Sequence, residues 1–194
     1  RVVGFLANTE EASIAFLAAC SLGAVWSSCS PDFGTSSVTD RFQQIEPKVL
    51  IAVDGYTYNG KPYDKIEVVQ EIVAALPTLK RVVLVPFLNE SAEAAAIPKA
   101  VSWADALGTP HDGLAFEPVP FAHPIWVLYS SGTTGIPKAI THSHCGVLLE
   151  HLKYLAFHND VHPGERFFWF STTGWMMWNF VQAAMLAGAT PVLC

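Results

Sequence analysis

The sequence predicts an α/β fold in which a mostly parallel sheet is covered by helices. Short apolar runs alternate with helical patterns along the 194 residues, as expected for this fold class. Most of these runs are continuously apolar, which is typical of strands covered on both faces. Hydrophobic residues make up 51% of the chain and charged residues only 14%, a balance that suits a chain with a substantial core.

Seven apolar segments are predicted as strands, each bounded by turn residues. They are residues 1–6, 24–29, 48–53, 81–87, 125–129, 166–171 and 190–194. The last two lie at the two ends of residues 167–194, a stretch with no charged residue. Polar and turn residues such as Gly174, Asn179 and Pro191 interrupt that stretch, whereas a membrane-spanning helix needs about 20 mostly apolar residues. Buried core is therefore favoured, and no membrane span is expected.

Helices are predicted between these strands because their ends are marked. Asn8 is expected to cap a helix over 9–22, with Glu11 as its capping-box partner and Gly23 as its stop. A second helix begins at Ser36 or Ser37 and ends at Glu46. Further helices are expected over residues 64–75, 145–157 and 175–187. Residues 108–124 are rich in Pro and Gly and are the only plausible subdomain boundary.

Charge and cysteine usage narrow the class of protein. A net charge of −6, a pI near 5.6 and no clustering of Lys and Arg argue against a nucleic-acid partner. The four cysteines are scattered without a C-x-x-C pair, which suits a reducing, cytoplasmic location. The chain lacks an initiator methionine and opens inside a predicted strand. We therefore expect residues 1–194 to be a fragment of a longer protein, and the sequence does not indicate its oligomeric state.

One loop carries a chemical signature. Tyr129 to Lys138 reads YSSGTTGIPK and directly follows a predicted strand, where α/β proteins place their ligands. Its glycines permit close backbone approach, its hydroxyls and amides can surround phosphate oxygens, and its lysine adds a cation. The predicted phosphate-binding residues are Ser130, Ser131, Gly132, Thr133, Thr134, Gly135 and Lys138.

Other loop classes fit this segment less well. A Walker loop requires G-x-x-x-x-G-K-[ST] opening a helix, but here Pro137 precedes the lysine and strand-like residues follow. A nucleophile elbow requires a serine flanked as G-x-S-x-G, which the loop lacks. A flexible Ser/Gly linker seldom sits between two apolar strands.

The loop resembles the phosphate-loop signature of the adenylate-forming superfamily, which includes acyl-CoA synthetases, luciferases and peptide-synthetase adenylation domains. Within it, residues 26–34, 44–50, 54–61 and 173–179 resemble the acetoacetyl-CoA synthetases. The resemblance covers the whole chain and places it in part of the large N-terminal, AMP-binding domain of that family, with the C-terminal domain absent.

The resemblance implies an acid–thiol ligase. A carboxylate, here acetoacetate, would attack the α-phosphorus of ATP with Mg²⁺ present, and the thiol of coenzyme A would then displace AMP. It implies phosphate binding by Ser130 to Gly135 and Lys138, an acyl pocket at Trp175, Met176 and Met177, and a coenzyme A role for Lys61, for which a solvated turn is an equal alternative. The family's adenine site, ribose-binding Asp and adenylation Lys would lie downstream, so the fragment alone is not expected to be competent.

Several alternatives stay open. Spacing alone makes Trp175, Met176 and Met177 ordinary helix core. The acid could instead be acetate or propionate, or the domain could be a non-catalytic nucleotide-binding or interaction module. His144, His151 and His158 repeat every seven residues, about 10 Å of helix per step, so they cannot share one metal. We expect no metal site.

Overall fold

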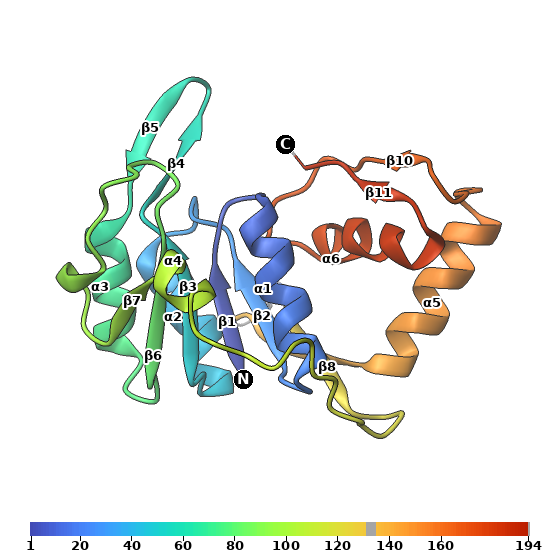
Figure 1. Ribbon diagram of the computed structural model, residues 1–194, viewed down its shortest axis with the longest axis horizontal. Coiled ribbons are helices and arrows are strands. Elements are labelled where there is room, and N and C mark those ends of the chain that lie inside the picture. The colour runs from blue at the N-terminus through green and yellow to red at the C-terminus, as the bar shows by residue number, and fades with distance from the viewer. Residues whose placement is uncertain (131–134, 194) are drawn as a thin grey trace.

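The structure, a computed structural model, describes residues 1–130 and 135–193. Its centre is a seven-stranded sheet in the order β7-β6-β3-β1-β2-β8-β9 (Figure 1). The strands are β1 (Val2–Phe5), β2 (Trp26–Cys29), β3 (Val49–Val53), β6 (Arg81–Val85), β7 (Ala100–Ser102), β8 (Pro124–Ser130) and β9 (Lys138–Ser143). All neighbours are parallel except β8 and β9, which are antiparallel. The predicted mostly parallel sheet is confirmed.

Helices cover both faces of the sheet. They are α1 (Glu10–Ser21), α2 (Thr35–Phe42) continued by η1 (Gln43–Ile45), α3 (Ile66–Ala75), α4 (Trp103–Leu107), α5 (His144–Phe157) and α6 (Met176–Gln182) continued by η3 (Ala183–Ala187). The chain passes from β1 through α1 to β2 on one side, and then through α2 to β3 on the other side of β1. With right-handed crossovers, these two connections lie on opposite faces.

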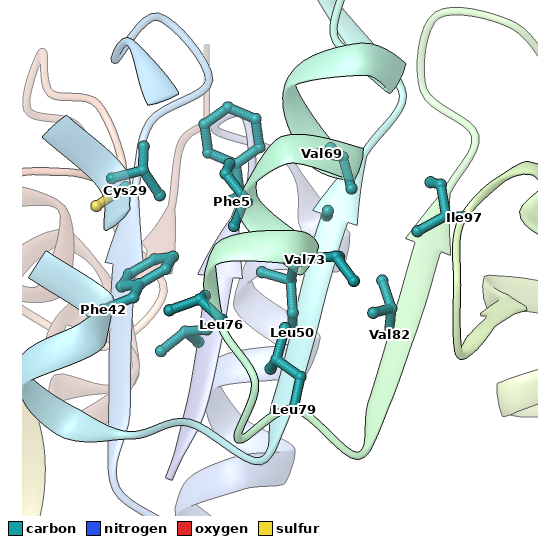
Figure 2. Close-up of a cluster of buried hydrophobic side chains, with 14 of the residues drawn as sticks. Phe5, Cys29, Phe42, Leu50, Val69, Val73, Leu76, Leu79, Val82 and Ile97 are labelled. Carbon is teal, nitrogen blue, oxygen red and sulfur yellow. The ribbon is translucent and has the colours of Figure 1, made fainter. Parts of the chain in front are cut away.

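The face under α2 and α3 buries aliphatic residues from neighbouring strands (Figure 2). Leu50 and Val82, from β3 and β6, pack with Val69 of α3 and with Leu76, the residue that follows this helix. All four are essentially inaccessible to water. Each such side chain contributes about 1.5–3 kcal/mol by leaving water. This layer anchors the strands whose ends carry the site.

The opposite face is built on aromatic rings around Phe16 of α1. Its ring centroid lies 6.1 Å from Trp26, 5.8 Å from Trp126 and 5.9 Å from Trp178. These tryptophans come from β2, β8 and α6. The cluster therefore fixes α6 against the sheet, and α5, α6, β10 (Arg166–Phe167) and β11 (Thr190–Pro191) gather beyond the β8 side (Figure 1).

Some small elements were not predicted from the sequence. Strands β4 (Gly55–Tyr58) and β5 (Lys61–Asp64) form a hairpin that extends beyond the sheet (Figure 1). Asn59 and Gly60 form its turn with φ of 49° and 70°, as in the two-residue turns that Asn-Gly favours. The short elements η2 (Ala94–Ala96), β7 and α4 also went unpredicted. Because β5 runs to Asp64, the third helix begins two residues later than expected.

Two predictions about local structure are wrong. Thr9, and not Asn8, occupies the N-cap position of α1, and no side chain caps that helix. The Asn8 side chain instead accepts a hydrogen bond from the indole Nε1 of Trp178 at 2.8 Å, so a tertiary contact replaces the local one. The strands expected over 166–171 and 190–194 shorten to two residues each. Among the described residues they pair with each other and with no further strand, and Pro191 has no N–H to donate.

Within residues 1–130 and 135–193, none of the helices has the length and apolar character that crossing a bilayer requires.

Candidate functional site

The ends of the predicted phosphate loop lie side by side on an antiparallel strand pair. Ser130 closes β8, Lys138 opens β9, and the two residues are direct partners in the register. Direct partners have Cβ atoms about 4.5–5.5 Å apart, so the two side chains begin close together. Lys138 is exposed to solvent. Ser131, Gly132, Thr133 and Thr134 lie outside the described residues.

Gly135 adopts a backbone conformation that favours glycine. Its φ is 88°, and a Cβ built on it would meet no atom of residues 1–130 and 135–193 within 4 Å. The glycine is therefore required by the backbone and not by a neighbouring side chain. Open space beside it is consistent with a ligand approaching the backbone closely.

Helix α2 and η1 brace both ends of the loop. The hydroxyl of Tyr129 donates to the carbonyl of Arg41 at 2.7 Å, and Nε2 of Gln44 donates to the carbonyl of Pro137 at 3.0 Å. Burial raises the pKa of the Tyr129 phenol, which keeps it protonated as a donor. Sequence reasoning missed these contacts, because they join residues far apart in the chain. The guanidinium of Arg41 lies 5.1 Å from the Phe33 ring centroid and 5.8 Å from that of Tyr129.

A second segment, residues 173–178, meets the carboxyl ends of β1 and β2. Thr173 is buried, and its hydroxyl donates to the carbonyl of Leu6 at 2.6 Å. The hydroxyl of Ser28 donates to the carbonyl of Thr173 at 2.7 Å. A Cβ on Gly174 would lie 2.9 Å from a ring carbon of Phe33, so this glycine is needed for close packing. The sheet therefore holds this segment and the end of β8, where the predicted phosphate loop begins, at the same edge.

A cavity of about 700 Å³ lies between β8, β9, α5 and the start of α6. Met176 and Met177, two of the three residues predicted for an acyl pocket, line it. Trp175 immediately precedes α6, is 62% exposed and is not among the lining residues of the described chain. Trp178 is buried in the aromatic core. The structure thus brings two of the three predicted residues to one cavity.

Two histidines from other elements also line this cavity, His142 of β9 and His151 of α5. Burial, reinforced by the neighbouring His142, lowers the pKa of His151 from 6.5 to about 4, against a small opposing effect of Glu150. Burial also lowers the pKa of His142. Both rings are neutral at physiological pH. Within the described part of the chain, the buried Nδ1 atom of each ring has no hydrogen-bond partner.

The lowered pKa of His151 predicts a stability that depends on pH. The folded ring stays neutral down to about pH 4, whereas the unfolded ring binds a proton near pH 6.5. The unfolded state therefore binds more protons between these values, and stability is lost as pH falls through them. We expect the unfolding free energy of the intact protein to fall by about 1–2 kcal/mol more between pH 7 and 4.5 than that of His151→Phe, after allowing for solvent screening. Chemical denaturation at both pH values measures this, and equal losses would contradict it.

Lys61 is exposed at the start of β5, opposite Tyr58 in the hairpin register. The rings of Tyr56 and Tyr63 stack with centroids 5.1 Å apart, and Nζ of Lys65 lies 5.5 Å from the Tyr56 centroid. The hairpin therefore presents aromatic and cationic groups beyond the end of the sheet.

Within residues 1–130 and 135–193, no group of three or more His, Cys, Asp or Glu side chains could hold a metal ion. Cys20 and Cys29 are free thiols, and burial raises the pKa of each to about 12. Both therefore stay protonated and are poor nucleophiles.

Comparison with known proteins adds to this geometry. The family model described as "AMP-binding enzyme" matches residues 1–194. Acetoacetyl-CoA synthetase from Gallus gallus is 44% identical and covers 100% of this chain and 30% of its own length. Acetoacetyl-coenzyme A synthetase from Rhizobium meliloti (strain 1021) is 47% identical, with 98% and 29% covered. Malonamoyl-CoA synthetase from Penicillium aethiopicum is 38% identical, with 100% and 28% covered.

A solved structure agrees with these relatives. Acetoacetyl-CoA synthetase from Streptomyces lividans superimposes with a TM-score of 0.92 at 51% identity, covering 100% of this chain and 29% of that one. The chain thus spans about 30% of the length of the curated relatives that it matches.

Proposed function

The chain belongs to the AMP-binding enzyme family, and we propose that the intact protein joins acetoacetate to coenzyme A with ATP through an acyl-adenylate, releasing AMP and pyrophosphate. The observation that carries this proposal is the similarity of the chain, over its whole length, to proteins named acetoacetyl-CoA synthetase. We propose that the reaction takes place in the cytoplasm, with ATP, coenzyme A and the acid as its substrates. Residues 1–194 would supply part of the N-terminal domain.

The phosphate loop would hold the β- and γ-phosphates of ATP. Ser130 and Lys138 lie opposite each other at its ends, and Gly135 has the open, positive-φ backbone that close approach needs. The cation of Lys138 would stabilise negative charge that builds as pyrophosphate departs. Ser131, Gly132, Thr133 and Thr134 are assigned to the same role by the motif.

Mg²⁺ would balance the charge of the triphosphate. The donors at the described ends of the loop are hydroxyl, amide and ammonium groups, and the described residues contain no acidic cluster. This set fits an ion held mainly by phosphate oxygens and water, which is how Mg²⁺ is commonly bound. In that arrangement the ion offsets phosphate charge, while the chain positions the nucleotide.

The acid would enter the cavity that Met176 and Met177 line. Methionine is unbranched and adaptable, so the two side chains can shape a slot for a short acyl group. Trp175, exposed beside the start of α6, would add a flat apolar wall once substrate is bound. Lys61, an exposed cation on the hairpin, is proposed to contact the phosphates of coenzyme A.

Activity of the intact protein on a set of acids tests this function. We expect kcat/KM to be highest for acetoacetate, compared with acetate, propionate and butyrate. Met177→Thr should shift the ranking toward shorter acids, by about 10- to 200-fold for each methylene that the altered pocket no longer fits. Met185→Thr is the matched control, because Met185 does not line this cavity. A wild-type preference for acetate, or an unchanged ranking in Met177→Thr, would contradict the assignment.

The same assay separates the alternatives. Acetate or propionate as the best substrate would identify a ligase for another short acid. Absence of ATP–pyrophosphate exchange with every acid would favour a non-catalytic nucleotide-binding module.

A further inference from the structure

The cavity has a polar side that the acyl-pocket prediction did not include. Met176 and Met177 approach it from α6, whereas His142 and His151 approach it from β9 and α5. His151 is only 7% exposed.

Aromatic packing fixes the orientation of the His151 ring. Its centroid lies 5.7 Å from Trp126 and 5.3 Å from Phe180, with an interplanar angle of 87° to Phe180. No partner for its buried Nδ1 atom exists among residues 1–130 and 135–193. An unsatisfied buried polar atom is costly in a native fold and calls for an explanation. Because Nδ1 is closed to solvent, a ligand in the cavity would meet the ring at its other nitrogen, Nε2.

The charge state of the ring restricts what it can bind. Burial lowers the pKa of His151 to about 4, so the ring carries one N–H donor and one acceptor at neutral pH. A neutral donor suits a ketone or amide carbonyl. A neutral ring does not form an ion pair with a carboxylate. The carboxylate end of the acid is therefore not favoured over the carbonyl at this position.

We propose that His151 donates a hydrogen bond to the carbonyl oxygen on the third carbon of the acyl substrate, and so selects 3-oxo acids over saturated acids of the same length. This inference rests on the proposed ligase function. Acetoacetate and butyrate share the four-carbon chain and differ at this carbon, so the pair isolates the contact. A site that hydrogen-bonds a substrate group discriminates strongly against analogues that lack it, and we expect one neutral hydrogen bond to supply about 10- to 100-fold.

The experiment uses the intact enzyme and its ratio of kcat/KM for acetoacetate to kcat/KM for butyrate. His151→Phe keeps a ring against Trp126 and Phe180 and removes the donor; it should lower the ratio about 10- to 100-fold. His151→Gln restores an N–H donor and should recover part of the ratio. His158→Phe is the matched control, since His158 lies just beyond the last residue of the same helix, is exposed and lines no part of the cavity. It should keep the wild-type ratio.

The ratio distinguishes a residue that contacts the substrate from one with a purely structural role. Loss of a structural residue would lower kcat/KM for acetoacetate and for butyrate together and leave their ratio unchanged. A His151→Phe enzyme with the wild-type ratio would overturn the inference while leaving the ligase function intact. If His151→Phe does not fold, a wild-type ratio in His151→Ala, assayed at low temperature, would overturn it in the same way. If the wild-type protein were inactive on acetoacetate, that result would contradict the proposed function, and the inference would fall with it.

Discussion

Replacing Lys138 by alanine in the intact protein is expected to lower ATP–pyrophosphate exchange about 100- to 1,000-fold. Lys138 is an exposed cation at the start of β9, directly opposite Ser130 at the other end of the phosphate loop. Loss of one preorganised group that stabilises charge in the transition state costs a few kcal/mol of barrier. The effect should appear with every acid, because it acts on the nucleotide.

Lys153→Ala provides the control for this result. Lys153 is an exposed lysine on α5 that pairs with Glu150 of the same helix at 2.7 Å, a surface contact worth about 0–1 kcal/mol. Its loss should leave exchange near the wild-type rate. Equal exchange in the Lys138→Ala enzyme and this control would show that Lys138 is not part of the phosphate site.

Gly135→Val should reduce exchange by a comparable amount for a different reason. The φ of 88° at Gly135 is strained for any side chain and worst for a β-branched one, costing about 1–3 kcal/mol. The new side chain also projects into the open space that the bound nucleotide is proposed to use. Gly164→Val is a matched control, since Gly164 has a φ of 84° and similar open space in a turn away from the loop.

The parallel sheet was predictable because its strands are continuous apolar runs, and glycine or proline marks most of the helix ends. The hairpin was missed although Asn59-Gly60 is a strong turn signal, since Tyr56, Tyr58 and Tyr63 were not read as strand residues. Asn8 was assigned as a cap from local pattern alone, but its oxygen serves Trp178. Local sequence cannot reveal that kind of competition.

The candidate site likewise contains residues that the local sequence predicts and residues that only the fold brings together. Lys138 and Gly135 were predictable because they belong to one contiguous motif. The cavity does not, because His142, His151 and Met177 come from three elements and meet only when β9, α5 and α6 pack together. A seven-residue spacing of histidines indicated only that they could not share a metal. Which of them is buried and without a partner depends on packing that the sequence does not state.

Asp54→Ala is expected to destabilise the protein by about 3–5 kcal/mol. Asp54 is 2% exposed, and its Oδ1 accepts hydrogen bonds from the backbone N–H groups of Phe87 and Leu88, both at 2.8 Å. Its Oδ2 accepts from Asn89 at 2.7 Å. Hydrogen bonds to a charged group contribute about 1.5–3 kcal/mol each and are not additive. Alanine would leave the backbone N–H groups of Leu88 and Asn89 without this partner, whereas the N–H of Phe87 also donates to the carbonyl of Val85 at 3.0 Å.

Asp54→Asn should cost roughly half as much, because its amide oxygen can still accept while its NH₂ group faces a donor. Asp112→Ala, at an exposed loop position, should change stability by less than about 0.5 kcal/mol. Urea denaturation of all three variants gives the comparison, and a loss below about 1 kcal/mol in Asp54→Ala would refute the expectation.

Asp54 also sits at the base of the hairpin, where its carbonyl accepts a hydrogen bond from the N–H of Lys65 at 2.7 Å. If Lys61 contacts coenzyme A as proposed, folded Asp54→Asn should raise KM for coenzyme A and leave ATP–pyrophosphate exchange unchanged.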